Sequence, residues 1–578
     1  MSRGPSPFRV VILTGWDSPS TREAIMSVVG VPGVKVAAVI YDRGVYPFKT
    51  RVRRLWKRSR REGWTYLAGR VLDAARGASQ RLLPRALDTI SPLRRVIFPG
   101  EVRSLIELCE RHGISYFSVD SLNGPEAQTH LTGLEADLGI VIGTRILKRQ
   151  TFALPRLGSI NVHKGKVPEY RGQPPAFWEL YNGAAEAGVT IHLVDEKLDA
   201  GHVVREGTIA ISVPETEHSL RLRLDELAAR LLAEAVELMA TGRASLRPQP
   251  PVTGRPYTTP TGAQRAALDR RLGTLPESRL KQWLKAAFYR VCLAGGPVWV
   301  RNGWLRLRRR TRCTVLLYHR VNDTSKDKLT TSVDRFIEHL AMLKRMYPVL
   351  SLSAACEALE IGRYLGPNVV AITFDDGYDD NYTCAAPVLE HFGLPGTFFV
   401  TAGLVDTAQP FPHDAGSPYR FSTLSWAQVK DLAGRGFEIG SHGWSHANLG
   451  QCSPDEAHRE IIDSRDMLQG KLGVRIRSFA YPFGGRDQVT ATVIRQIEDA
   501  GFDRIASAYG GVNVNPLDCR NVVRIGVGEV SDTWALRAKI EGIDLQAIHE
   551  SWPGRGVLAA GSAGLGTQPL STSRRRPS

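Results

Sequence analysis

The sequence contains little cysteine and no long apolar run. Its 578 residues include seven cysteines, and no two of them form a Cys-x-x-Cys pair. This odd, scattered set argues against a disulfide framework or a cysteine-based zinc site and favours a reducing compartment. No apolar run of about 18 or more residues is present, so no membrane-spanning helix is predicted. The first residues lack the features of a signal peptide, and we expect a cytoplasmic protein.

Acidic residues are scarce in two segments of the chain. Residues 45–95 hold 14 basic and 3 acidic residues, and residues 301–312 hold six arginines and no acid. Together they account for the whole formal net charge of +17, so the rest of the chain is neutral in total. A uniformly basic, nucleic-acid-binding protein is therefore not predicted, whereas two local basic patches are.

Aromatic side chains interleave with both basic patches. Lys49–Arg61 contains eight basic residues with Trp56 among them, and Trp304 lies within the second patch. This pattern suits an interfacial helix on anionic lipid, and it also suits nucleic-acid phosphates or an ordinary solvated helix face. Of these, we favour peripheral contact with an anionic membrane at its inner face and do not expect a nucleic acid partner.

Strand-like and helix-like patterns alternate along most of the chain, 43% of which is hydrophobic. Such alternation predicts an α/β protein. Roughly the first 240 residues favour a mainly parallel, doubly wound sheet, and the residues from Thr314 onward favour a barrel-like domain. We expect a first domain over 1–262 with the basic insertion at 45–95, a basic connector over 263–312, a second domain over 313–552 and a disordered tail over 553–578.

Polar residues gather in the first domain where strands are expected to end. Asn161 and His163 lie two apart on one predicted strand, so their side chains point to the same face, and Asp199 follows later. Acyl transfer to an amine needs a donor for the oxyanion and an acceptor for the amine proton. These three residues can supply both, or they can merely satisfy a strand end and a turn.

A longer series of motifs surrounds these residues. It comprises Asn161-Val162-His163, Pro168-Glu169-Tyr170-Arg171-Gly172, Gly188-Val189-Thr190-Ile191-His192 and Leu198-Asp199-Ala200-Gly201. In this order the series resembles the folate-dependent formyltransferase family, whose members act on methionyl-tRNA, glycinamide ribonucleotide or amino sugars. The likeness covers roughly residues 8–262 and implies a Rossmann-like, doubly wound domain.

The resemblance implies a role for each matching residue. Asn161 would stabilise the oxyanion, His163 would assist proton transfer, and Asp199 would orient or deprotonate the attacking amine. The formyl donor would be 10-formyltetrahydrofolate. Substrate contacts would come from Tyr170, Arg171 and Gly172, and the folate-pocket loop would contribute Gly143, Arg145, Ile146 and Leu147.

Two departures from the family pattern bear on the acceptor. The loop after His163 reads Lys164-Gly165-Lys166-Val167-Pro168, where many members have Pro-Ser-Leu-Leu-Pro. The tRNA-acting members also have a further small β-domain, whereas a basic connector and another enzyme-like domain follow here. We therefore expect a small amine, such as an amino sugar, and keep an aminoacyl-tRNA as the alternative.

The second domain contains a metal-ligand pattern. Asp375 and Asp376 lie at a predicted strand end, and His442 and His446 follow. Two histidines at i and i+4 on one helical turn can face a single ion, and a carboxylate completes a catalytic set with open positions. The neighbouring carboxylate stays free as a base. The plainer alternative is a turn-forming Asp-Asp-Gly and two unrelated histidines.

With Leu317-Tyr318-His319-Arg320 and Phe479-Ala480-Tyr481-Pro482-Phe483-Gly484, this set resembles the polysaccharide deacetylase family. The likeness covers roughly residues 313–535 and implies a distorted (β/α) barrel. Asp376, His442 and His446 would then bind a divalent metal, zinc or similar, and Asp375 would be the general base. Tyr481 and Pro482 would line the substrate groove.

Two features of that family are not evident here. Many members carry an arginine before the groove motif, where this chain reads Phe479-Ala480. The late Leu-x-His general acid is also missing, because His549 is off spacing. His319 is the candidate to approach the site in its place.

Together these patterns predict a bifunctional enzyme acting on the nitrogen of an amino sugar, nucleotide- or lipid-linked. Two schemes fit: deacetylation exposes an amine that is then formylated, or formylation is transient and later reversed. We favour the first scheme. The alternative of another class is a membrane- or nucleic-acid-binding protein whose catalytic domains are vestigial.

Overall fold

The computed structural model describes residues 7–44, 93–272 and 288–543, apart from short gaps within the last two ranges. The chain divides into two compact units. The first comprises Met1–Glu277 with Pro410–Arg420, and the second comprises Ser278–Gln409 with Phe421–Ser578. The predicted tail and all but the end of the predicted basic insertion lie outside the described residues.

The first unit is built on a seven-stranded sheet in the order β3-β2-β1-β4-β5-β6-β7. Strands β1 to β5 pair in parallel, and β6 and β7 continue the sheet antiparallel. The strands are β1 (Phe8–Thr14), β2 (Val34–Asp42), β3 (Ser115–Val119), β4 (Leu138–Ile142), β5 (Ser159–His163), β6 (Glu186–Leu193) and β7 (Val203–Ala210).

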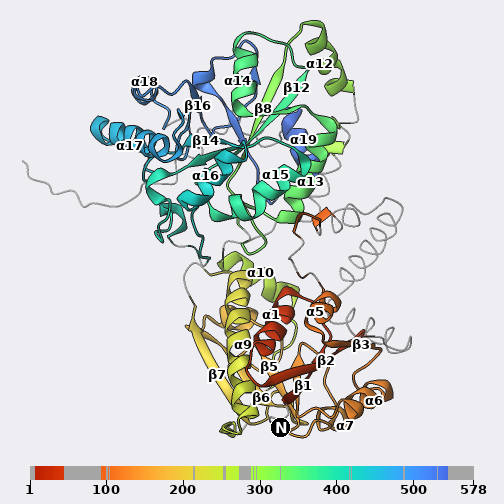
Figure 1. Cartoon of the computed structure of the whole chain (residues 1–578). Coiled ribbons are helices and arrows are strands. Elements are labelled where there is room, and N and C mark those ends of the chain that lie inside the picture. Colours follow the sequence, from red (N-terminus) through yellow and green to blue (C-terminus); the bar gives the residue numbers. More distant parts are fainter. Residues whose placement is uncertain are drawn as a thin grey trace, which may run out of the picture. The chain divides into compact units, whose positions relative to one another are not determined.

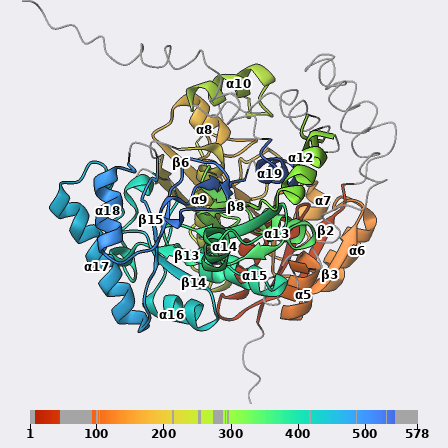
Figure 2. The same cartoon turned by 90° about the horizontal axis from the view of Figure 1, so that it is seen from above.

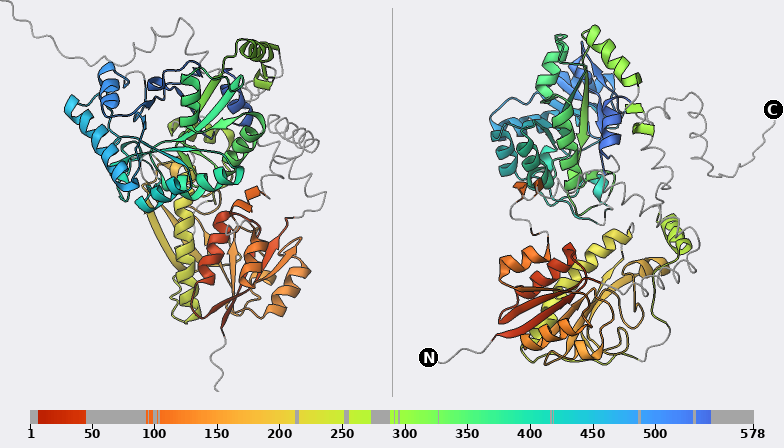
Figure 3. Two further views of the ribbon diagram at one scale, coloured as in Figure 1. Left: turned by 45° about the horizontal axis from the view of Figure 1, so that its top comes forward. Right: turned by 90° about the vertical axis from the view of Figure 1, so that its right-hand side faces the viewer.

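Helices cover both faces of this sheet (Figure 3). Alternate residues of β1 enter two different cores, Val10 and Ile12 on one face and Val11 and Leu13 on the other. Each such buried side chain stabilises the fold by about 1.5–3 kcal/mol. The helices are α1 (Pro19–Val29), α5 (Leu105–His112), α6 (Pro125–Leu134), α7 (Arg149–Phe152), α8 (Phe177–Asn182), α9 (Glu217–Ala240) and α10 (Gly262–Arg271).

The long helix α9 shows why the sequence folds in this way. Thr216 and Ser219 form a capping box at its start. Leu220, Leu224 and Leu231 then recur at helical spacing and are buried, so one face of α9 closes the core.

The second unit contains a nine-stranded sheet with the path β16-β15-β14-β13-β12-β8-β17, while β11 pairs with β12 and β18 with β8. All of these pairs are parallel except that of β17 with β8. The strands are β8 (Arg312–Tyr318), β11 (Val349–Leu350), β12 (Asn368–Phe374), β13 (Thr397–Val400), β14 (Glu438–Ser441), β15 (Ser478–Ala480), β16 (Arg504–Ala506), β17 (Asn513–Val514) and β18 (Arg524–Gly526). Two short strands, β9 (Arg320–Val321) and β10 (Thr330–Thr331), pair separately.

Helices pack around the outside of this curled sheet (Figure 1), and α17 and α18 lie side by side at one edge of it (Figure 2). They are α12 (Gly296–Leu307), α13 (Val333–Met346), α14 (Leu352–Glu360), α15 (Ala386–Phe392), α16 (Trp426–Gly434), α17 (Pro454–Leu472), α18 (Ala491–Asp499) and α19 (Thr533–Ile540). The predicted fold class, a doubly wound domain followed by a distorted barrel, is confirmed. Among the described residues, no helix is both long and apolar enough to cross a membrane.

Candidate active sites

The first candidate site lies at the end of β5. Asn161 and His163 are two residues apart on this strand, so their side chains project from the same face of the sheet. Antiparallel pairing with β6 sets His192 directly opposite Asn161. The strand pair thus supplies one amide and two imidazoles within a few ångströms of one another.

Asp199 reaches this group from the loop between β6 and β7, with a backbone φ of 51°. Its Oδ1 lies 3.4 Å from Asn161 Nδ2, and its Oδ2 lies 3.5 Å from His163 Nδ1. The backbone N–H of Gly172 donates to Oδ2 at 3.1 Å. The structure therefore brings together the three residues predicted to be catalytic.

The hydrogen bonds of His163 determine which ring nitrogen is basic. Nε2 lies 2.8 Å from the carbonyl oxygen of Tyr170, which only accepts hydrogen bonds, so Nε2 holds the proton. Nδ1 is then the nitrogen that can accept a proton, and it faces Asp199. Burial lowers the pKa of His163, although Asp199 and the Tyr170 carbonyl act in the opposite direction. At pH 7 the ring is therefore neutral.

His192 belongs to this cluster, although no catalytic role was predicted for it. Its Nδ1 donates to the carbonyl of Leu193 at 2.8 Å, so its Nε2 accepts from Asn161 Nδ2 at 3.2 Å. Burial alone would raise the pKa of Asp199, but His192, His163 and a backbone N–H outweigh it and lower that pKa. The sequence signal was the motif that ends in His192, but its strand partner is visible only in the fold.

The predicted substrate-binding residues of this unit hold the loop after β5 in place. Arg171 is buried and donates to the carbonyl of Leu198 at 3.3 Å. The ring of Tyr170 stacks on Tyr257 with centroids 5.7 Å apart. Gly172 has a φ of 98°, and a Cβ there would overlap the Tyr257 carbonyl oxygen. These contacts position the loop against the carboxylate, and direct contact with substrate stays a prediction.

The predicted folate-pocket loop follows β4. Gly143 begins it with a φ of 58°. Arg145 Nε donates to Asp42 Oδ2 at 2.9 Å, and Nη2 bonds the same carboxylate. Leu147 is buried, whereas Ile146 is exposed. Arg145 is thus engaged with β2, and folate contact by these four residues stays a prediction.

The second candidate site lies at the carboxyl ends of β12 and β14. Asp375 and Asp376 directly follow β12, and His442 directly follows β14. Asp376 Oδ1 lies 3.4 Å from His442 Nε2 and 3.2 Å from His446 Nε2. One ligand atom from each of Asp376, His442 and His446 lies within 4.8 Å of the other two, and all three residues are buried.

The helical turn predicted for the two histidines is wrong. The chain leaves β14 and bends through residues 443–446 without forming a helix. Gly443 and His446 have φ angles of 79° and 64°, which no α-helix contains. The His-x₃-His spacing therefore brings both rings to one point through a tight loop rather than through helical periodicity.

The donor set fits a divalent metal ion. Two imidazoles and one carboxylate form the three-ligand set that leaves positions for water and substrate. His442 Nδ1 donates to the carbonyl of Ala480 at 2.9 Å, which leaves the lone pair of Nε2 facing Asp376. Such a backbone partner fixes the tautomer and orientation of a metal-ligating histidine.

Arg524 holds the neighbouring carboxylate, Asp375, in a bidentate pair. Its Nη1 and Nη2 donate to the two carboxylate oxygens at 2.6 and 2.8 Å. Its Nε donates to the carbonyl of Ser507 at 2.9 Å, and the side chain is fully buried. Burial alone would raise the pKa of Asp375, but Arg524 and His442 lower it below its usual range.

Arg524 does not lie before the groove motif, where many members of the resembled family carry an arginine. It comes from β18 instead, well after that motif in the sequence. The only sequence signal was an arginine inside the apolar run Val522-Val523-Arg524-Ile525, because a buried arginine in a strand requires a partner.

The groove residues differ in their exposure. Tyr481 and Pro482 are buried, and the N–H of Tyr481 donates to the carbonyl of Ala506 at 3.1 Å. Phe483 is half exposed, and its ring centroid lies 4.9 Å from that of His446. Phe483 is therefore the aromatic side chain that borders the histidines, whereas substrate contact by Tyr481 and Pro482 stays a prediction.

His319 lies close to the metal-ligand cluster, at the end of β8. Burial lowers its pKa, and the nearby charges of Asp376 and Asp375 oppose that shift. Asn381 Nδ2 donates to the carbonyl of His319 at 2.7 Å. The structure thus places a half-buried imidazole beside the two carboxylates, whereas His549 lies outside the described residues.

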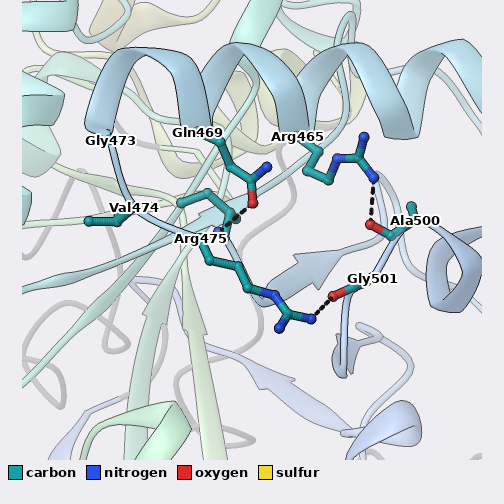
Figure 4. A pocket seen from close by; sticks show the side chains of 8 residues that line it. Arg465, Gln469, Gly473, Val474, Arg475, Ala500 and Gly501 are labelled. Carbon is teal, nitrogen blue, oxygen red and sulfur yellow. Dashed lines mark hydrogen bonds between the residues drawn. The ribbon is translucent and has the colours of Figure 1, made fainter.

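A surface depression of about 630 Å³ lies elsewhere in the second unit, at the end of α17. Arg465 donates to the carbonyl of Ala500 at 2.7 Å, and Arg475 donates to that of Gly501 at 3.2 Å (Figure 4). The two arginines that line the depression are thus bonded to the protein backbone, and the depression shares no residue with either candidate site.

Each of the two units matches a family of known proteins. A family model described as formyl transferase matches residues 95–236, and one described as polysaccharide deacetylase matches residues 363–504. The chain therefore contains a formyl transferase domain and a polysaccharide deacetylase domain.

Individual relatives cover only parts of the chain. A methionyl-tRNA formyltransferase from Trichlorobacter lovleyi is 37% identical over 138 residues, which are 24% of this chain and 44% of that protein. The deacetylase PplD of Streptococcus pyogenes, solved with acetate, is 23% identical, with a TM-score of 0.35. That match covers 40% of this chain and 98% of the PplD chain. Glycinamide ribonucleotide transformylase 1 of Symbiobacterium toebii is 16% identical, with a TM-score of 0.30. That match covers 43% of this chain and 98% of the transformylase.

Proposed function

We propose that the chain is a bifunctional carbohydrate-modifying enzyme. Its first unit transfers a formyl group from 10-formyltetrahydrofolate to the amine of an amino sugar, and its second unit hydrolyses an N-acyl group of a sugar. The observation that supports this proposal most directly is the assembly of two separate catalytic clusters, Asn161 with His163 and Asp199, and Asp376 with His442 and His446.

In formyl transfer, the nitrogen of the acceptor attacks the formyl carbon, and the amine loses a proton. The bond between that carbon and N10 of the folate then breaks, and N10 leaves with a proton in exchange. The basic Nδ1 of neutral His163 accepts the proton of the amine, and Asp199 stabilises the resulting imidazolium from 3.5 Å. The N–H of Asn161 that donates to Asp199 at 3.4 Å in this structure turns to the formyl oxygen, where negative charge develops. His192 orients the amide of Asn161 through its Nε2, which makes it a positioning residue.

In acyl hydrolysis, Asp376, His442 and His446 would hold the divalent metal. Such an ion polarises the amide carbonyl and lowers the pKa of bound water. Asp375 accepts the proton of the attacking water, and Arg524 keeps its carboxylate ionised and oriented. The C–N bond then breaks, and the proton that Asp375 accepted passes to the departing amine. His319, an imidazole near both carboxylates, is the candidate to relay that proton.

A sugar acceptor is favoured by the second unit. A polysaccharide deacetylase domain in the same chain suggests that both reactions occur on related substrates. Relatives of the first unit include methionyl-tRNA formyltransferases, which keeps an aminoacyl-tRNA as the second candidate acceptor. Of the two orders, we favour deacetylation followed by formylation, because hydrolysis exposes the amine that formyl transfer consumes.

The sugar is proposed to be nucleotide- or lipid-linked, and the enzyme is proposed to act in the cytoplasm. Contact with an anionic membrane is a further proposal, whose surface is described below. The competing function is that of a binding protein with vestigial catalytic domains. It predicts no stoichiometric metal and no reaction in either unit.

Mass spectrometry tests the proposed function. The protein is incubated with UDP- and dTDP-linked amino and N-acetylamino sugars, 10-formyltetrahydrofolate and a divalent metal, with and without chelator. We expect acetyl loss that requires metal and formyl gain that requires His163. His202→Ala, an exposed histidine of the same unit, is the matched control for His163→Ala. Absence of both mass changes, with formylation of methionyl-tRNA instead, would overturn the sugar assignment.

A further inference from the structure

Helix α12 packs only one of its faces on the second unit. Val298 and Leu305 are buried, and Arg301 pairs with Glu541. Asn368, the first residue of β12, donates from Nδ2 to Asn302 Oδ1 at 3.2 Å. These contacts attach α12 beside the amino ends of the barrel strands.

The opposite face of α12 is apolar and exposed. Trp299 is 75% exposed, Val300 62%, Trp304 53% and Leu307 81%. At 100° per residue, these four positions fall within about 140° of one another around the helix axis. Single exposed apolar residues are ordinary, but a continuous stripe with two tryptophans marks an interaction surface.

Arginines border this stripe at its carboxyl end. Arg306, Arg308 and Arg309 are exposed, and residues 301–312 contain no acid. The guanidinium of Arg308 lies 5.8 Å from the Trp304 ring centroid, so charge and aromatic ring occupy one surface. A positive patch of this kind is complementary to an anionic surface.

The loop after α14 extends the same surface. Arg309 lies over the ring of Tyr364, 5.7 Å from its centroid, and the N–H of Leu365 donates to Thr311 Oγ1 at 2.9 Å. These contacts hold the loop beside the end of α12. Ile361 is 78% exposed on it, and Arg363 is exposed as well.

We propose that α12 and the 361–364 loop form a docking surface for an anionic lipid bilayer. Tryptophan rings prefer the boundary between headgroups and acyl chains, and arginines prefer the phosphate level above it. Here the tryptophans lie on a helix whose apolar face is open, and the charged residues within 301–312 are all arginines. A helix with this distribution lies in the plane of the interface rather than across the membrane.

Docking in this way would fix the direction in which the metal-ligand cluster faces. Helix α12 lies near β12 (Figure 1) and contacts its first residue, Asn368, whereas Asp376 comes two residues after its last. The seven residues of β12 span roughly 20 Å. If the second unit is the hydrolase proposed above, its site faces the aqueous side, and a water-soluble, nucleotide-linked sugar is the better substrate class.

Co-sedimentation with vesicles tests the docking surface. The full chain is mixed at physiological salt with vesicles of phosphatidylcholine alone or with 30% phosphatidylglycerol, without substrate or added metal. We expect retention on the anionic vesicles, and a fall of at least about 10-fold in the binding constant for the double variant Trp299→Ser/Trp304→Ser. Trp16→Ser, which replaces an exposed tryptophan of the first unit, is expected to bind as the native protein does.

A second variant tests the charge separately. Arg306→Gln/Arg308→Gln/Arg309→Gln is expected to weaken retention and reduce its dependence on salt, whereas Arg459→Gln/Arg495→Gln, which changes exposed arginines of α17 and α18, is not. Thermal unfolding checks that each variant is folded. The proposal is overturned if anionic vesicles retain no protein or retain the tryptophan variant equally. It is also overturned if light scattering shows a dimer that the tryptophan variant abolishes.

Discussion

The two clusters use the carboxyl ends of strands in different ways. In the first unit a single carboxylate, Asp199, lies between two imidazoles and accepts a backbone N–H. In the second unit two adjacent carboxylates lie side by side, and a buried guanidinium neutralises only one of them. The first arrangement resembles a proton-transfer site, and the second resembles a cation site beside a base.

This difference shows how the surroundings assign a role to each carboxylate. Both oxygens of Asp375 accept from Arg524, so its charge is already balanced, and each oxygen keeps a lone pair that can take the proton of a water. Asp376 instead faces the Nε2 atoms of His442 and His446. Neutral imidazoles supply no charge to match that carboxylate, and a divalent ion does.

Removal of the metal ligand is expected to have the largest effect. Asp376→Asn leaves two imidazoles without their charged partner, so bound metal and acyl hydrolysis both fall below detection. Elemental analysis and the hydrolysis assay measure the two losses, and formyl transfer is unchanged. Asp455→Asn, at an exposed position of α17, is the matched control. Stoichiometric metal in Asp376→Asn would contradict the assigned ligand set.

Removal of the base in the first unit is expected to cost about 10²–10⁴-fold in formyl transfer. His163→Ala deletes the Nδ1 that accepts the amine proton, while the deacetylase reaction and metal content stay as in the native protein. Comparing the kcat of His163→Ala with that of the control His202→Ala isolates this effect. Equal rates for the two variants would exclude His163 from the reaction.

Loss of the guanidinium is expected to affect both stability and rate in the second unit. Arg524→Gln leaves Asp375 buried without its charged partner, which costs about 3–5 kcal/mol of unfolding free energy. Hydrolysis falls because the base is misoriented, while metal content is retained. Chemical denaturation and elemental analysis are the measurements, and Arg459→Gln is the control. A stable variant with native activity would show that Asp375 is not the base.

The pH profile is expected to show a smaller difference. Because burial lowers the pKa of His163, its neutral form persists below the usual value of about 6.5. As the pH falls through that lowered pKa, the ring becomes protonated and formyl transfer declines. The acidic limb of kcat/KM should therefore lie below about pH 6.5. A limb above that value that does not follow the pKa of the amine substrate itself would mean that another group is the proton acceptor.

The sequence predicted the strands of both sheets more closely than the loops between them. The strand predicted to hold Asn161 and His163 is β5, and the strand end predicted at Asp375 and Asp376 is that of β12, because strand-like patterns are local features of the sequence. The loop at 443–446 was predicted as a helical turn, because spacing alone does not distinguish helical periodicity from two positive-φ residues.

Long-range partners were the other limit of prediction. Asp375 and Arg524 are far apart in the sequence, and only the pairing of β18 with β8 beside β12 brings them together. His192 meets Asn161 for the same reason, through antiparallel pairing of β5 with β6. The order of the motifs predicted the main residues of each site. Their further partners, Arg524 and His192, are determined by how the strands pair in the sheets.

One crossed assay tests the central claim that the chain holds two independent active sites. Native protein, Asp376→Asn and His163→Ala are each given an N-acetylamino nucleotide sugar and, separately, its free amine with 10-formyltetrahydrofolate. We expect Asp376→Asn to lose only deacetylation and His163→Ala to lose only formylation. Loss of both reactions in either variant, or of neither, would contradict the account.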